Sequence, residues 1–187
     1  MRKNSGFTLM ELMVGLAIIG VMTAIAVPNY LEWLPDNRLK DVARGIYGDM
    51  QLAKLNAIKE HKDWAIVFDP TNKKYYVCSD KGTATSWALS NITDKKIVPV
   101  KTVVFPNLSG IQFGKGSATK DATTATNGQS FGTNYITFTL DYATFNPLGL
   151  GKSGYVYVEN IKRTTYAIGM ESTGFIKIKK WAGSAWK

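Results

Sequence analysis

The sequence predicts an α+β fold in which a long N-terminal helix packs on a mainly antiparallel β-sheet head. One observation is an apolar run, residues 7–27, in which Glu11 is the only charged residue. Another is a stripe of apolar residues between Leu39 and Ala57 at spacings of three and four, the period of an amphipathic helix. A third is a succession of short β-like runs from Trp64 onward.

The apolar run is long enough to cross a bilayer, because 21 helical residues span about 30 Å. Arg2 and Lys3 precede the run, and the first acidic residue after it is Glu32. This charge asymmetry predicts a cytoplasmic N-terminus and a head outside the cytoplasm. A charge inside a membrane helix costs about 3 kcal/mol or more and usually marks function, so Glu11 is the first candidate functional residue.

Three kinds of segment fit the run. A secretory signal cleaved after Ala26 matches the small-x-small pattern Ala24-Ile25-Ala26, but the run exceeds an ordinary signal core and carries a carboxylate. A generic membrane anchor fits the length and gives Glu11 no role. The third kind is suggested by GFTLMELMVGLAIIGVMTAIAVPNY, which closely resembles the N-terminus of type IV prepilins: a short basic leader ending in Gly, then Phe, then Thr-Leu-x-Glu-Leu.

The resemblance implies a processing site. A prepilin peptidase would cut between Gly6 and Phe7 and methylate the new amine of Phe7. Residues 1–6 would be the leader, residues 7–28 the transmembrane and filament-core helix, and residues 29–187 the amphipathic helix with the β-rich periplasmic or extracellular head.

The resemblance also implies partners and a location. The partners are other pilin or pseudopilin subunits, the prepilin peptidase, the inner-membrane assembly platform, and the inner membrane itself through residues 7–27. The protein would cross the bacterial inner membrane once and then enter a pilus or pseudopilus.

Elementary electrostatics suggests a role for Glu11 in assembly. A carboxylate in a membrane should be paired or neutralised, and cleavage would place the amine of Phe7 about one helical turn away. In a stack of subunits, Glu11 could instead reach the amine of a neighbour, which would help to set the axial register.

Several residues of the predicted helix carry local expectations. Pro28 removes a helical hydrogen bond, and with Pro35 it predicts a kink. Asp36 is expected to cap the amphipathic half. Gly45 and Gly48 are expected to allow close packing against a sheet, and the helix should end near His61.

The predicted strands begin with a hairpin, 64–69 and 74–78, around the turn Asp69-Pro70-Thr71-Asn72-Lys73. A Gly/Ser/Thr/Ala-rich stretch between residues 109 and 133 predicts a long surface loop. In the last predicted strand, Lys177 and Lys179 should share one face. The later predicted strands are Ile97–Phe105, Tyr135–Leu140, Tyr155–Val158, Tyr166–Met170 and Phe175–Trp181.

The head resembles the GspH/FimT-type minor pilins and pseudopilins in three stretches: the helix end DMQLAKLNAIK, the strand ending Phe68-Asp69-Pro70, and Phe145-Asn146-Pro147-Leu148-Gly149 running into a β-run. These motifs are looser than the N-terminal one. A structural subunit of a type IV pilus or type II secretion pseudopilus is therefore the predicted function. A major pilin and a soluble secreted protein are less favoured alternatives.

Motifs that suggest an enzyme lack their required context. Residues 149–154 match G-x-G-x-x-G and contain Gly-Lys-Ser, but a strand is predicted to follow, whereas both nucleotide motifs need a helix N-terminus. Cys78 lies in an apolar run and is expected to be buried, and His61 and the scattered aspartates lack metal-ligand spacing. No catalytic residue, cofactor or metal is predicted.

The basic C-terminal region leaves a second function open. The chain carries a net charge of +9, and a DNA-binding minor pilin for DNA uptake could contact DNA through basic and aromatic side chains in this region. The Gly-Arg-x-Arg motif of such proteins is replaced here by Gly174-Phe175-Ile176-Lys177, and a solvated basic strand face explains the same residues. The candidate DNA contacts are Lys177, Lys179, Lys180 and Trp181.

Overall fold

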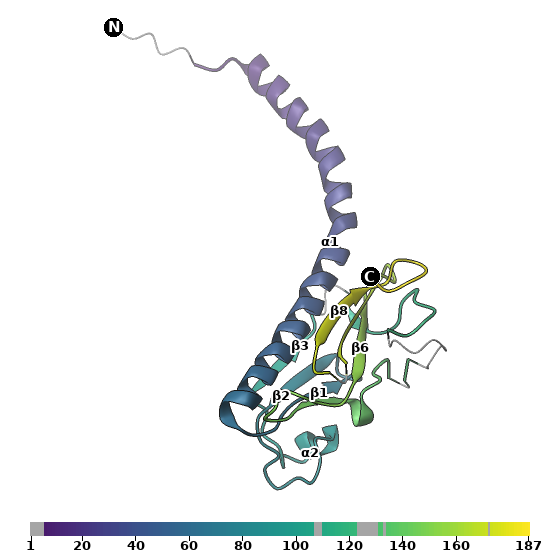
Figure 1. The fold of residues 1–187 in the computed structure, drawn as a ribbon. Helices are drawn as coiled ribbons and strands as arrows, with labels where there is room; N and C mark the ends of the chain where they lie inside the picture. The colour runs from purple at the N-terminus through teal and green to yellow at the C-terminus, as the bar shows by residue number, and fades with distance from the viewer. Residues whose placement is uncertain (1–5, 107–109, 123–130, 133, 172) are drawn as a thin grey trace. The chain divides into compact units, whose positions relative to one another are not determined.

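The computed structural model describes residues 6–106, 110–122, 131–132, 134–171 and 173–187 (Figure 1). The chain divides into two compact units, Met1–Pro35 and Asp36–Lys187. Most of the predicted leader and the middle of the predicted 109–133 loop lie outside the described residues.

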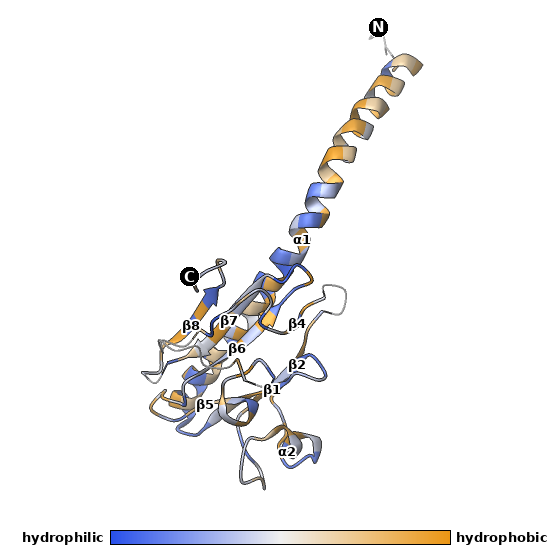
Figure 2. Cartoon of the chain, turned by 90° about the vertical axis from the view of Figure 1, so that its right-hand side faces the viewer, coloured by the Kyte–Doolittle hydropathy of each residue, from blue (hydrophilic) through white to orange (hydrophobic). Residues whose placement is uncertain are grey.

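Helix α1 (Leu9–Glu60) is a single continuous helix. Its residues from 12 to 27 are apolar nearly all round, and the corresponding turns are mainly orange in Figure 2. Its residues in the second unit bury one stripe, as predicted, and the helix ends one residue before His61. The buried residues of this stripe are Leu39, Ala43, Ile46, Asp49, Met50, Ala53 and Ala57.

Two local expectations for this helix are wrong. Asp36 is not an N-cap, because α1 runs through it without interruption. Gly48 does not pack on a sheet: it is exposed, and a Cβ there would meet nothing within 4 Å, whereas a Cβ at Gly45 would lie 4.0 Å from the Tyr75 hydroxyl. The packing face passes instead through Ala43, Ala53 and Ala57, whose small side chains bring the helix close to the sheets.

The first sheet is antiparallel and has the order β3-β2-β1-β5. The predicted hairpin is confirmed at both ends: β1 (Trp64–Asp69) and β2 (Lys74–Cys78) pair from Asp69↔Lys74 to Ala65↔Cys78. The edges are β3 (Lys101–Val104) and β5 (Tyr142–Phe145). The short helix α2 (Leu89–Thr93) lies between β2 and β3 in the sequence.

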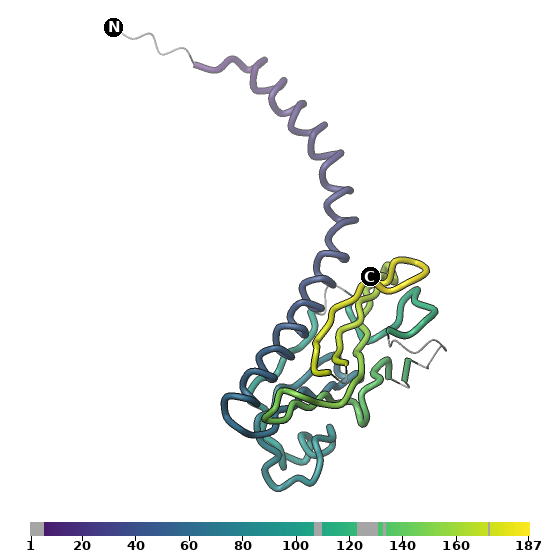
Figure 3. Tube along the Cα trace, in the orientation of Figure 1, coloured from purple at the N-terminus to yellow at the C-terminus, as the bar shows by residue number. Residues whose placement is uncertain are grey.

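The second sheet is also antiparallel and has the order β4-β6-β7-β8. Its strands are β4 (Gln112–Phe113), β6 (Gly154–Glu159), β7 (Thr165–Met170) and β8 (Ile176–Lys180). The last three strands match the prediction within two residues at each end. The course of the chain through both sheets can be followed in Figure 3.

Three strand predictions need correction. Residues 135–140 form an isolated bridge at Ile136 and enter a 3-10 turn (η2, Thr139–Asp141), and the strand begins only at Tyr142. Leu140 and Asp141 both have positive φ, near 60°, which interrupts an extended chain. Strand β3 is shorter than the predicted 97–105, and β4 forms inside the stretch predicted as a loop.

The main core lies between α1 and both sheets. Ile46 and Met50 of α1 share one buried cluster with Phe68 of β1 and Val156 of β6. Two smaller buried clusters cover the outer faces of the sheets. The cluster on the first sheet contains Trp87, and the cluster on the second sheet contains Tyr155 and Tyr157. Strand β1 is consequently buried along its whole length.

Candidate functional site

The first turn of α1 is closed by a reciprocal pair of side chains, Thr8 and Glu11. The hydroxyl oxygen of Thr8 accepts a hydrogen bond from the backbone N–H of Glu11 at 3.2 Å. In return, the Glu11 carboxylate accepts hydrogen bonds from the backbone N–H and the hydroxyl of Thr8, both at 3.0 Å. This capping box satisfies helix-end donors that have no partner within the helix.

The capping box places Glu11 at one end of the apolar segment, in the first turn. A negative charge is favourable there because the helix dipole is positive at its N-terminus. Thr8 is a functional candidate that the charge argument missed. The Thr-x-x-Glu spacing directly ahead of an apolar run identifies it from the sequence.

Gly6 and Phe7 lie in the non-helical segment that precedes α1, and both are exposed. The Phe7 side chain is 87% exposed, and a Cβ at Gly6 would meet nothing within 4 Å. A peptide bond in such a segment is open to a peptidase, since exposed chain outside regular structure is where cleavage concentrates.

The apolar segment, residues 7–27, presents its large side chains to solvent in the part of the chain that the structure describes. Every large apolar side chain from Phe7 to Val27 is exposed, and α1 has the length and composition of a helix that could cross a membrane. Thr23 does not add polarity, because its hydroxyl donates a hydrogen bond to the carbonyl of Ile19 at 2.6 Å. An apolar surface this extensive indicates a lipid or protein environment that covers it.

Pro28 and Pro35 both lie inside the continuous helix. Each lacks the N–H that would bond to the carbonyl four residues earlier, so each leaves one helical hydrogen bond unmade. The kink predicted at Pro28 stays a prediction.

Asp36 fastens the helix to the turn between β6 and β7. Its carboxylate accepts hydrogen bonds from the Asn160 amide at 2.6 Å and from the Thr164 hydroxyl at 2.8 Å. Partial burial acts to raise the pKa of Asp36, but these two hydrogen bonds and the charges of Lys162 and Lys180 outweigh it, so the pKa is lowered. The residue expected to cap a helix instead joins helix to sheet.

The candidate DNA contacts on β8 and after it are largely engaged with the protein itself. Lys177 forms an ion pair with Glu171 at 2.7 Å, and the Lys179 ammonium donates to the carbonyl of Ala122 at 2.7 Å. Burial lowers the pKa of Lys179. Trp181 is buried and packs edge-on against Trp186, so its ring is not presented for stacking on a base.

The fourth candidate, Lys180, is exposed like Lys177, and its ammonium lies 6.0 Å from the Tyr166 ring centre. DNA binding through this surface stays a prediction, and the geometry gives it little support.

The remaining chemical candidates fit structural roles. Residues 149–153 lead into β6, which begins at Gly154, and Gly149 has the positive φ (71°) that favours glycine. Cys78 is buried, and burial raises its pKa to about 12, so the thiol is unreactive. Among the described residues, no group of three or more His, Cys, Asp or Glu side chains could hold a metal ion.

Comparison with known proteins adds three relationships. The family of the prokaryotic N-terminal methylation motif matches residues 1–27. The type IV major pilin protein PilA of Myxococcus xanthus is 29% identical over 127 residues, which cover 65% of this chain and 56% of that protein. A fimbrial protein of Pseudomonas aeruginosa is 29% identical over 125 residues, covering 65% of this chain and 77% of the relative. The chain thus spans little more than half the length of the M. xanthus relative.

Two solved structures are similar to this chain at low sequence identity. The type IV minor pilin FimU of P. aeruginosa has a TM-score of 0.50 at 10% identity, over 81% of this chain and 94% of that one. The minor pseudopilin EpsH of Vibrio cholerae has a TM-score of 0.49 at 12% identity, over 75% of this chain and 95% of that one.

Proposed function

Since the chain is a type IV pilin-like protein, we propose that it is a non-enzymatic structural subunit, a minor pilin or pseudopilin, of a type IV pilus or type II secretion pseudopilus. The observation that carries the proposal is the apolar segment of residues 7–27, which is exposed throughout and begins with a capped helix directly after Gly6-Phe7. Such an apolar surface needs to be buried away from water. The membrane buries it before assembly, and the core of the filament buries it afterwards.

Maturation in the membrane and assembly into a filament are the two proposed stages. The prepilin peptidase removes residues 1–6 on the cytoplasmic side, and Phe7 becomes the methylated N-terminus. Residues 7–28 hold the protein in the inner membrane with the head, residues 29–187, outside. The inner-membrane assembly platform then transfers the subunit to a filament of other pilins.

N-terminal sequencing and mass spectrometry of the mature protein test the maturation step. A methylated Phe7 is the expected first residue. A chain that begins at Val27 would show instead that the segment is a secretory signal, and the proposal would be wrong.

The minor role is supported by the three head motifs quoted above and by the shared fold of the minor pilin FimU. The M. xanthus relative supports a major pilin instead. Quantitative mass spectrometry of isolated filaments separates the two: a minor subunit is expected as a small fraction of the total pilin.

Glu11 is proposed to serve twice, first as the capping residue and then as the partner of a neighbour's Phe7 amine. The variants Glu11→Gln and Glu11→Ala separate these roles, because Gln at this position still completes a capping box but carries no charge. Both variants should be processed and inserted into the membrane, and both should be strongly depleted from filaments.

A matched control is Asp41→Asn, which neutralises an exposed carboxylate of the same helix and should enter filaments normally. Normal incorporation of Glu11→Gln together with loss of Glu11→Ala would show that only the helix cap matters. In that case the intersubunit charge pair would not exist.

A further inference from the structure

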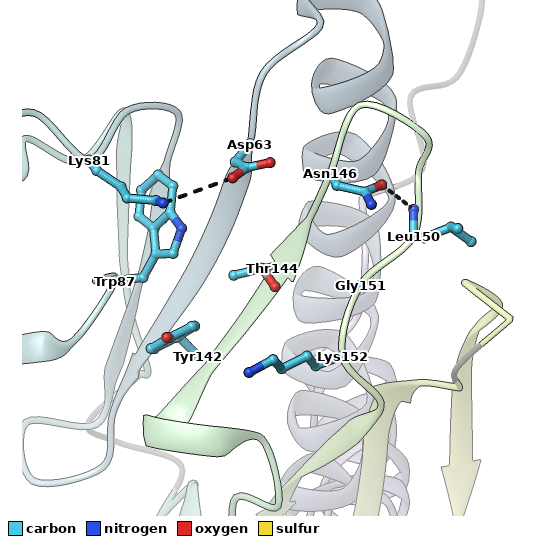
Figure 4. Close-up of a pocket in the computed structure, with 9 residues that line it drawn as sticks. All are labelled: Asp63, Lys81, Trp87, Tyr142, Thr144, Asn146, Leu150, Gly151 and Lys152. Atoms are coloured by element: carbon cyan, nitrogen blue, oxygen red, sulfur yellow. Dashed lines mark hydrogen bonds and ion pairs between the residues drawn. The ribbon is translucent and has the colours of Figure 1, made fainter. Parts of the chain in front are cut away.

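A pocket of about 440 Å³ lies beside β5, on the face of the first sheet that is turned away from the main core (Figure 4). Its volume is in the range of pockets that hold small-molecule ligands. All of its lining residues belong to the second unit, and the apolar segment of residues 7–27 contributes none of them.

Strand alternation builds the floor of the pocket. Ala143 and Phe145 of β5 point into the main core, so Tyr142 and Thr144 point to the opposite face and line the pocket. Asn146 continues the same alternation just beyond the strand. These three side chains provide two hydroxyl groups and one amide.

The pairing of β1 with β5 brings a carboxylate to the same place. Trp64 pairs with Phe145, so Asp63, one residue before β1, comes to lie beside Asn146. The Asp63 carboxylate lies 4.0 Å from the ammonium of Lys81, and both side chains are partly exposed. At this distance the ion pair is weak, so the Asp63 carboxylate can still accept hydrogen bonds from a ligand in the pocket.

Trp87 forms an apolar wall behind this ion pair. The side chain is buried in the cluster that covers the outer face of the first sheet. The Lys81 ammonium lies 5.8 Å from its ring centre. Since Trp87 is only 3% exposed, it closes one side of the pocket and does not offer its ring face to a ligand.

The opposite wall is the glycine-rich turn before β6. The Asn146 side-chain oxygen accepts hydrogen bonds from the backbone N–H groups of Leu148 at 3.0 Å and Leu150 at 2.9 Å, which fixes the turn. A Cβ at Gly151 would overlap the carbonyl oxygen of Thr144, so glycine is needed for the turn to lie against β5. The wall is therefore preformed.

Lys152 extends from this turn into the pocket, on the side of Tyr142 (Figure 4). It is exposed, and among the described residues its ammonium has no ion-pair partner. The pocket thus offers a free cation on one side and a carboxylate on the other, with neutral hydrogen-bonding groups between them.

We propose that this pocket binds an acidic sugar, a pyranose that carries one carboxylate. The sugar carboxylate pairs with Lys152, and the sugar hydroxyls donate to Asp63 and accept from the Asn146 amide.

The same residues disfavour a nucleotide or another phosphate. The Gly-Lys-Ser sequence here precedes strand β6, so it lacks the helix N-terminus that phosphate loops use. The Asp63 carboxylate can accept a hydrogen bond from a sugar hydroxyl, whereas it has no proton to donate to a phosphate oxygen. The proposal is independent of filament assembly.

The test uses the full-length chain in a detergent without a sugar headgroup, titrated with glucuronate, glucose and inorganic phosphate in turn and followed by calorimetry. Glucuronate should bind saturably, glucose about fivefold more weakly, and phosphate should not displace glucuronate. Absence of saturable glucuronate binding, equal affinity for glucose, or displacement by phosphate would each overturn the proposal.

Variants locate the site. Lys152→Gln should weaken glucuronate about fivefold and leave glucose unchanged, and Asp63→Asn should weaken both sugars. The control Lys40→Gln removes an exposed cation of α1 outside the pocket and should change neither affinity. Unchanged glucuronate binding in Lys152→Gln, with circular dichroism showing the parent fold, would place any binding elsewhere and refute the assignment.

Discussion

Removal of the Asp49 carboxylate should destabilise the head, because this group joins helix α1 to two strands of the first sheet. Its carboxylate, on the buried face of α1, accepts a hydrogen bond from the Tyr75 hydroxyl at 2.7 Å. It also accepts from the Lys101 ammonium at 2.7 and 2.9 Å. One side chain of the helix thus holds both β2 and the edge strand β3.

The magnitude follows from what Asp49→Ala leaves behind. The Tyr75 hydroxyl, in a side chain that is 2% exposed, would lose its partner, at a cost of about 2 kcal/mol. The Lys101 side chain is about half exposed, so its part of the ion pair adds only about 0.5–1 kcal/mol. The sum is about 2.5–3 kcal/mol, which should lower Tm by about 5–12 °C in a chain of this size.

Thermal unfolding of the full-length chain in detergent, followed by circular dichroism, measures this loss. The decisive comparison is with the double variant Asp49→Ala/Tyr75→Phe, which has no buried hydroxyl left without a hydrogen-bond partner. It should be about 1 kcal/mol more stable than Asp49→Ala alone. The control Asp41→Ala removes an exposed carboxylate of the same helix and should change stability by less than about 0.5 kcal/mol.

Two results would refute this reasoning. If Asp49→Ala unfolds at the parent temperature, the buried carboxylate does not hold the edge of the sheet. If the double variant is less stable than Asp49→Ala, the stability lost in Asp49→Ala does not come from a Tyr75 hydroxyl without a hydrogen-bond partner.

Two further predictions concern charged groups of the second unit. The pKa of Asp36 is lowered from its ordinary value of 3.8, so its bonds stabilise the fold fully above that value and lose this effect as pH falls through the lower folded pKa. The Tm difference between the parent and Asp36→Asn should therefore be constant above about pH 5 and shrink below pH 4. Thr164→Val removes one of the two hydrogen bonds and should shift this loss of stability to higher pH. A Tm difference that grows as the pH falls would contradict the assignment. If the basic surface binds duplex DNA, the affinity should fall steeply with salt and weaken on charge reversal of Lys177, Lys179 and Lys180; unchanged binding in that variant would exclude this surface.

Local sequence signals predicted the elements that local interactions define. The β1–β2 hairpin is confirmed at both ends because its turn is fixed by neighbouring residues: the Asp69 carboxylate accepts hydrogen bonds from the backbone and side chain of Asn72. The buried stripe of α1 is likewise confirmed, since a period of 3.6 residues needs no knowledge of what lies opposite.

Contacts between segments that are distant in the sequence could not be predicted from local sequence patterns. The predicted strand at 135–140 is wrong because Leu140 and Asp141 adopt positive φ, which nothing in their own side chains requires. Asp36 was expected to cap a helix, and its real partner, Asn160, lies 124 residues further along the chain. The pocket beside β5 depends on β1 lying between β2 and β5, an order that no short pattern in the sequence encodes.

The capping box changes the energetic argument about Glu11. A lone carboxylate within an apolar run suggests a large cost that only a partner could offset. In the structure the carboxylate lies in the first helical turn and is already bonded to Thr8, so its presence in a monomer needs no second subunit. The case for an intersubunit contact therefore depends on cleavage: removal of residues 1–6 would create an amine at Phe7, one residue from the group that Glu11 already binds. The uncharged but cap-competent Glu11→Gln is consequently the variant whose behaviour in filaments decides between the two roles.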